Sequence, residues 1–209
     1  MNDIYLILVP TGALSPEERF LRLCSPHRRK KLEAIAHPDE WRRSLGVEIA
    51  LHWGLLALSD GYMPPPRYAI GENGRPELSG SDWRMSLAHS GEMALCALSK
   101  ARLGVDLERK ERLSRIPAAD WVALESYLKY TGEGLSGNWR KLKPSGAEML
   151  AEDGKALAFL YRLEVEAYRI CVACREKARI FLLRISPEEM ESLPESADAI
   201  ARAFVRVPC

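Results

Sequence analysis

The sequence has little of what several classes of protein require. No apolar run approaches the length of a membrane-spanning segment. The formal net charge is only +1, which gives no support to bulk binding of nucleic acid or of an anionic membrane surface. The N-terminal segment 1–10 is short and lacks the basic start of a signal peptide, so we interpret it as a first strand. A cytoplasmic protein without a nucleic-acid or membrane partner is therefore expected.

Cysteine is scarce, and its spacing does not form a metal or disulfide framework. The chain has five cysteines, an odd number, at positions 24, 96, 171, 174 and 209. Because most of them lie in apolar runs, we interpret them as reduced core residues. Cys171 and Cys174 have CxxC spacing, but no second pair or histidine cluster follows them, and the segment has the character of a strand. Zinc or redox chemistry is not expected there.

What the sequence does contain is an ordinary globular composition with two regions of mixed structure. With 209 residues, it is long enough for one large domain or two small ones, and it has no repeat or low-complexity segment. Helices are expected over 39–58, 117–130 and 187–192, with shorter ones opened by Ser15-Pro16 and Ser25-Pro26. Strands are expected over 3–9, 68–70, 85–87, 94–98, 103–107, 157–174 and 178–185. The expected fold is α+β, with one lobe over 1–102 and a second, similar lobe over 103–209.

Two acidic residues lie two positions apart in the segment Gly104-Val-Asp106-Leu-Glu108. Because side chains alternate across a strand, both carboxylates are expected on one face, with Val105 and Leu107 on the other. Adjacent carboxylates repel unless a cation or a proton joins them, and Mg²⁺ completed by substrate phosphates is one solution. The alternative is a surface strand with two solvated acids, next to a basic stretch that follows at positions 109–112.

Six short motifs, taken in order, resemble those of the 4′-phosphopantetheinyl transferases of the surfactin-synthetase type. Each motif is weak by itself, but the shared order over residues 25–134 favours kinship. The matching segments are Ser25–Lys31, Arg43-Ser44-Leu45, Gly74-Arg75-Pro76, Met85–Ser90, Gly104–Glu108 and Trp121–Gly134. The resemblance implies two α+β lobes of one chain related by a pseudo-twofold axis, and a monomer.

The resemblance also implies a reaction. The 4′-phosphopantetheine arm of coenzyme A is transferred to a serine of an acyl or peptidyl carrier protein, and adenosine 3′,5′-bisphosphate is released. In this interpretation Arg28, Lys31 and Arg43 clamp the 3′-phosphate of coenzyme A, since Arg offers a fork of donors to phosphate and Lys a point charge. Arg75 and His89 reach adenine-side or phosphate oxygens.

The catalytic residues implied by the resemblance are acidic, with one lysine. Asp106, Glu108 and Glu125 hold Mg²⁺ against the pyrophosphate. Glu125, or water on the metal, deprotonates the incoming serine. Lys129, one helical turn after Glu125, contacts the pyrophosphate and stabilises the leaving group. The alternatives are a plain i,i+4 surface pair for Glu125 and Lys129, a buried histidine beside a turn for His89, and a solvated basic helix face.

The chain departs from the family pattern in two places. Leu124 stands where the family has lysine, and it is expected to join Trp121 and Leu128 on an apolar stripe. Between Glu108 and the helix of Glu125 only about a dozen residues remain, where the family normally has a few tens, although an extended linker still spans the distance. Two functions are weighed: an active transferase, or a weakened relative that binds coenzyme A or a carrier protein without transfer. An unrelated α+β binding protein is a third.

Overall fold

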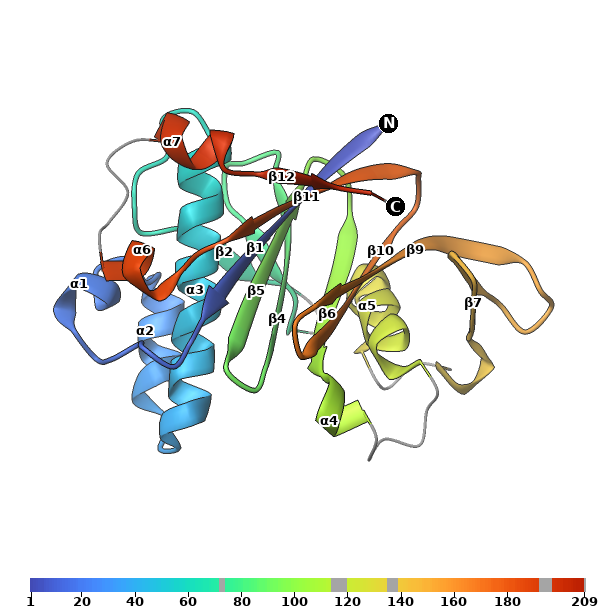
Figure 1. The fold of residues 1–209 in the computed structure, drawn as a ribbon, viewed down its shortest axis with the longest axis horizontal. Coiled ribbons are helices and arrows are strands. Elements are labelled where there is room, and N and C mark those ends of the chain that lie inside the picture. Colours follow the sequence, from blue (N-terminus) through green and yellow to red (C-terminus); the bar gives the residue numbers. More distant parts are fainter. Residues whose placement is uncertain (72–73, 114–119, 135–138, 192–196, 209) are drawn as a thin grey trace.

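The computed structural model describes residues 1–71, 74–113, 120–134, 139–191 and 197–208, and its core is built from two five-stranded sheets (Figure 1). In the first sheet, β1 (Asn2–Pro10) is central, pairing antiparallel with β5 (Met93–Ser99) and parallel with β11 (Ala178–Arg184). The edges of this sheet are β4 (Arg84–Ser90) and β12 (Val205–Val207).

The second sheet is antiparallel throughout. Its order is β6 (Leu103–Arg109), β10 (Tyr168–Cys174), β9 (Ala156–Val165), β8 (Glu148–Leu150) and β7 (Lys143–Ser145). A separate hairpin joins β2 (Tyr68–Ile70) to β3 (Pro76–Leu78). Strand β6 is therefore an edge strand, with one side open to other elements.

The helices begin and end where local chemistry favours it. Ser25 caps the start of α2 by accepting a hydrogen bond from the Arg28 backbone N–H, and Pro26 occupies the first turn. Helix α5 ends at Gly132, whose φ of 80° lies in the left-handed region that glycine tolerates. The helices are α1 (Glu18–Leu21), α2 (Pro26–Glu33), α3 (Pro38–Leu58), α4 (Lys110–Leu113), α5 (Trp121–Thr131), α6 (Pro187–Glu191) and α7 (Ala197–Arg202), with a 3₁₀ turn at Trp139–Lys141.

The elements stack in four layers because the strand side chains alternate. On β1, Ile7 and Val9 join the core against α3, whereas Ile4, Leu6 and Leu8 join the core between the two sheets. The outer face of the second sheet is covered by α5 (Figure 1). The order of layers is therefore α3, first sheet, second sheet, α5.

Helix α5 has its own core. Val122, Leu124 and Tyr127 pack against Met149 and Leu160 of the second sheet. Leu124 and Leu128 are buried as predicted, but Trp121 is only partly buried, and of the three only Leu124 belongs to this core. An apolar residue at position 124 is therefore explained by packing against the second sheet.

The mixed α+β class is confirmed, while the division into lobes at 102/103 stays a prediction. Strands β11 and β12 return to the first sheet, so the expected boundary separates the two sheets only as far as Cys174. Part of the predicted helix 117–130 (residues 117–119), the end of helix 187–192, and Cys209 lie outside the described residues.

The four described cysteines are free and buried, as predicted for core residues. Burial raises the pKa of the Cys171 thiol to about 12 and that of Cys174 to about 11, which makes both poor nucleophiles. Within the described ranges, no helix has the length and apolar character needed to cross a bilayer.

Candidate metal and phosphate site

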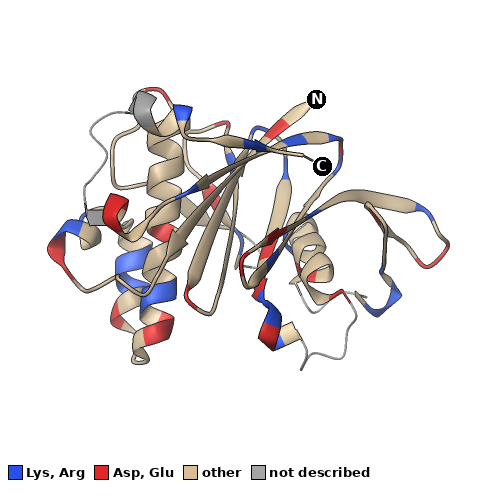
Figure 2. Ribbon diagram, viewed as in Figure 1, with Lys and Arg blue, Asp and Glu red and all other residues tan. Residues whose placement is uncertain are grey.

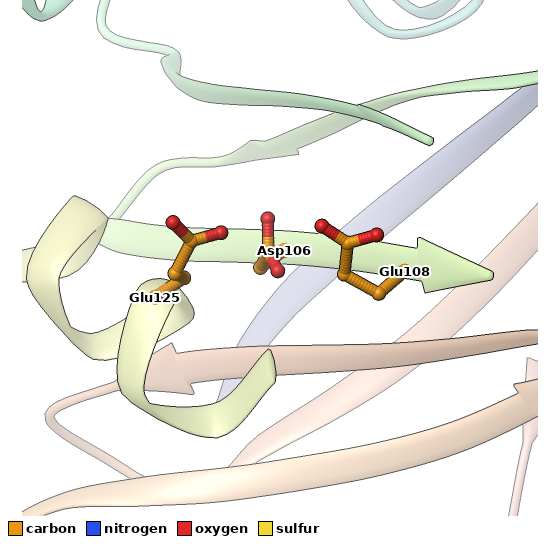
Figure 3. Close-up of side chains that lie close together, drawn as sticks. All are labelled: Asp106, Glu108 and Glu125. Carbon is orange, nitrogen blue, oxygen red and sulfur yellow. The ribbon is translucent and has the colours of Figure 1, made fainter. Parts of the chain in front are cut away.

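The acidic pair lies on the face of β6 that looks toward α5. Val105 and Leu107 are buried in the core between the two sheets. Asp106 and Glu108 project to the opposite face, as the alternation predicts, and Figure 3 shows their carboxylates beside that of Glu125, which comes from α5. The structure thus places all three predicted carboxylates together.

Gly104 sets the distance between β6 and α5. It lies on the same face of the strand as Asp106 and Glu108, and α5 passes directly over it. A Cβ on Gly104 would lie 2.1 Å from the Ser126 carbonyl oxygen and 2.2 Å from the Tyr130 backbone nitrogen, closer than any real contact. Because the helix backbone rests on a residue with no side chain, Glu125 and Lys129 reach the acidic pair.

The three carboxylates form a compact set of oxygen donors. One oxygen from each of Asp106, Glu108 and Glu125 lies within 4.8 Å of the others. Asp106 is 3% exposed, and its Oδ1 accepts a hydrogen bond of 2.8 Å from Nζ of Lys129. Its Oδ2 is buried and has no hydrogen-bond partner among the described residues. A donor set of carboxylate oxygens alone, with one buried oxygen unsatisfied, fits a hard cation such as Mg²⁺.

Serine side chains of β4 hold β6 in place. The Ser86 hydroxyl accepts from the Val105 backbone N–H at 3.0 Å, and the Ser90 hydroxyl accepts from that of Arg109 at 3.1 Å. Ser90 also donates to Oε2 of Glu108 at 2.6 Å. These serines join the edge strands of the two sheets and orient one metal-ligand candidate.

Glu125 is the carboxyl group whose protonation is most perturbed in the site. Burial, followed by the nearby Asp106 carboxylate, raises its pKa to about 7, while Lys129 opposes the shift. A group with this pKa accepts and releases protons at neutral pH, as general acid–base chemistry requires.

The raised pKa of Glu125 predicts how the stability of the metal-free protein varies with pH. Between pH 4.5 and about 7 the folded protein retains a proton that the unfolded chain has released, so stability falls as the pH rises through this window. The unfolding free energy of wild type, relative to Glu125→Gln, should therefore decline across the window and stay level outside it. Urea denaturation in the presence of a chelator measures this, and a difference that does not vary with pH contradicts it.

The three carboxylates line a pocket of about 420 Å³ together with basic, aromatic and aliphatic residues. Arg28, Lys31 and His89 line it together with Lys129, so these predicted residues share one site. The basic positions of α2 and α3 and the acidic positions of β6 are seen in Figure 2. Desolvation, followed by the nearby Arg28, holds the pKa of Lys31 below its ordinary value.

Two predicted phosphate ligands are turned toward protein groups instead of the pocket. Arg43 pairs with Glu40 at 3.0 Å, and Glu40 lies 3.8 Å from Nε2 of His89. Burial lowers the pKa of His89 and outweighs the attraction of Glu40. The Arg75 guanidinium donates to the backbone carbonyls of three residues, Lys129 at 2.6 Å and Tyr130 and Leu103 at 3.0 Å.

Arg75 therefore caps the C-terminal end of α5 and ties it to the start of β6. It also lines a second pocket of about 310 Å³ that shares the walls formed by Glu125 and Lys129 with the first. Arg75 and Arg43 adjoin the main pocket without lining it.

Sequence reasoning missed a buried acid that contacts Arg28 of the pocket lining. Glu48 of α3 is 0% exposed and contacts Arg28 and Tyr68, which both line the pocket. Its position carried a signal, because it lies three residues after Leu45 and seven after Trp41, on the apolar face of the helix. An acid on such a face needs a buried partner.

Comparison with known proteins gives the same family as the motif order. The chain is 24% identical over 145 residues to 4′-phosphopantetheinyl transferase Sfp of Bacillus subtilis, an alignment covering 57% of this chain and 65% of that protein. It is 26% identical over 153 residues to the putative 4′-phosphopantetheinyl transferase slr0495 of Synechocystis, covering 58% and 62%. The chain is thus distantly similar to 4′-phosphopantetheinyl transferases over a little more than half of its length. No family model matches it.

The similarity covers only part of each relative. The chain spans 62–65% of the length of these relatives. These relatives are named as 4′-phosphopantetheinyl transferases. In the present chain the site places three carboxylates beside the cations Arg28 and Lys31.

Proposed function

We propose that this protein transfers the 4′-phosphopantetheine arm of coenzyme A to a serine of an acyl or peptidyl carrier protein, in a reaction that depends on Mg²⁺. The observation that carries the proposal is the cluster of Asp106, Glu108 and Glu125 at the end of a pocket walled by Arg28 and Lys31. Carboxylates alone repel a pyrophosphate, and cations alone offer no metal ligands. Their combination suits a metal-bound phosphate ester.

Each part of the pocket has a role in this proposal. Arg28 and Lys31 bind the 3′-phosphate of coenzyme A, and His89 lies close enough to contribute from β4. Arg43 supports this wall through Glu40 and His89, while Arg75 contributes on the adenine side from the neighbouring pocket.

The acidic end of the pocket carries the chemistry. Asp106, Glu108 and Glu125 would hold Mg²⁺, which when bound neutralises charge on the pyrophosphate. Glu125, or water on the metal, would accept the proton of the incoming serine hydroxyl. Lys129 leaves its contact with Asp106 Oδ1 to stabilise the departing phosphate.

The proposal includes the organisation of the chain. Each five-stranded sheet carries one long helix on its outer face, α3 on the first and α5 on the second, and this supports two lobes related by a pseudo-twofold axis, over 1–102 and 103–209. Because described residues of α2, α5 and both sheets line the pocket together, we propose a monomer, acting in the cytoplasm.

One observation favours a second function, the binding of coenzyme A or a carrier protein without transfer. Only seven residues lie between the end of α4 at Leu113 and the start of α5 at Trp121. Relatives of the superfamily are longer than the region matched here. A linker this short offers few residues with which to hold a carrier protein.

A transfer assay separates the two functions. The purified protein is incubated with coenzyme A, Mg²⁺ and a panel of apo acyl and peptidyl carrier proteins, and the carriers are weighed by mass spectrometry. Transfer adds one phosphopantetheine to a carrier, and a chelator prevents it. Glu125→Gln is the matched variant, expected to fold and to transfer slowly. Carriers of unchanged mass, with binding still present by calorimetry, favour the second function.

A further inference from the structure

The buried carboxylate of Glu48 is held by three donors. Its Oε1 accepts from the Ser25 backbone N–H at 2.8 Å, and its Oε2 accepts from Nε of Arg28 at 3.2 Å and from the Tyr68 hydroxyl at 2.9 Å. Glu48 does not line the pocket, but two of these donors do. It therefore contacts Arg28 and Tyr68 on the side away from the pocket.

These bonds fix both the position and the direction of Arg28. Ser25, which Glu48 holds through its N–H, is the N-cap of α2, and its hydroxyl accepts from the Arg28 backbone N–H at 3.1 Å. One turn before Glu48 on α3, the Ser44 hydroxyl accepts from Nη1 of Arg28 at 3.0 Å. The start of the helix and the guanidinium are thus both tied to α3.

The arrangement leaves one edge of the guanidinium for a ligand. Nε and Nη1 donate to α3, whereas within the described ranges no protein acceptor bonds to Nη2. A buried ion pair is a weak source of stability, because the cost of removing two charges from water offsets most of their attraction. In this protein the ion pair keeps the Arg28 guanidinium ordered at the pocket before a ligand binds. This lowers the conformational entropy lost on binding.

We propose that Glu48 is a positioning residue that presents Arg28 to the 3′-phosphate of coenzyme A. The inference rests on the proposed function, and it adds a residue that touches no substrate. It predicts that the loss of Glu48 affects recognition of the 3′-phosphate more than recognition of the remainder of the molecule.

Calorimetric titration with coenzyme A and with 3′-dephospho-coenzyme A tests this. Wild type is expected to prefer coenzyme A by about tenfold or more, as one charged hydrogen-bonded contact provides. In Glu48→Gln the affinity for coenzyme A should fall about tenfold, while that for the dephospho form should change by less than about twofold. Glu33 is an exposed acid on α2, the helix of Arg28; Glu33→Gln makes the same change in net charge and should alter neither affinity.

Three results with folded Glu48→Gln overturn the inference: an unchanged preference, an equal loss for both ligands, or tighter binding of coenzyme A because the carboxylate merely cancels the charge of Arg28.

If circular dichroism shows that Glu48→Gln is unfolded, Ser44→Ala decides, because it keeps the ion pair and frees Nη1. In Ser44→Ala the preference for coenzyme A over 3′-dephospho-coenzyme A should fall about threefold. An unchanged preference in this variant overturns the inference. Wild type that binds neither ligand overturns the proposed function, and wild type that binds both equally overturns only the inference.

Discussion

Replacing Asp106 with asparagine is expected to slow phosphopantetheine transfer about a thousandfold, because several kcal/mol of charge stabilisation depend on this carboxylate. Asp106 is the most buried of the three acids and has an unpartnered oxygen, Oδ2, beside Glu108 and Glu125. Asparagine keeps the shape of the side chain but removes the charge. Initial rates with saturating coenzyme A and carrier protein measure the effect.

The control for this variant is an exposed aspartate. Asp82→Asn removes the same charge from an exposed ion pair with Lys100. Neither residue lines the pocket, so the rate should stay unchanged. Thermal unfolding establishes that both variants fold. An Asp106→Asn protein that transfers within about threefold of the wild-type rate would remove the acidic cluster from the mechanism.

Gly104→Ala is expected to destabilise the protein by about 3 kcal/mol or more and to abolish coenzyme A binding with it. The added methyl group would lie 2.1 Å from the Ser126 carbonyl oxygen and 2.2 Å from the Tyr130 nitrogen, both backbone atoms that cannot rotate away. Helix α5 must therefore shift from β6, and Glu125 and Lys129 move with it. Urea denaturation and calorimetry measure the two effects.

Gly12→Ala provides the matched control. A Cβ on Gly12 meets nothing within 4 Å, and its backbone has no unusual φ, so its stability should stay within about 0.5 kcal/mol of wild type. Equal stability and equal binding in the Gly104→Ala protein would show that α5 does not need to contact β6 in order to form the site.

The parts of the fold that follow local periodicity were predictable from the sequence. The alternation at 104–108 placed Asp106 and Glu108 on one face, and the three- and four-residue spacing of apolar residues predicted α3. The pairing of β11 with β1 was not predictable in this way, because it joins residues more than 170 positions apart in the chain. Strands β7, β8 and β12 are three residues long, too short to give a periodic signal.

In the site, too, the sequence predicted local features but not the contacts between distant segments. The motifs named the residues of the pocket, but a motif does not say which donors the folded protein itself satisfies. Arg75 matches a ligand motif, yet its guanidinium donates to three backbone carbonyls at the junction of α5 and β6. Glu48 belongs to no quoted motif, and its role depends on α2 and Tyr68 meeting α3 in three dimensions.

The central claim is that the carboxylate cluster and the basic wall form one metal-dependent site for coenzyme A. Calorimetric titration of coenzyme A, with Mg²⁺ and then with a chelator, tests it most directly. The structure predicts binding with Mg²⁺ that weakens at least about tenfold in the chelator, because the three acids then face the pyrophosphate without a cation between them. Equal affinity under both conditions, or no binding under either, would contradict the claim.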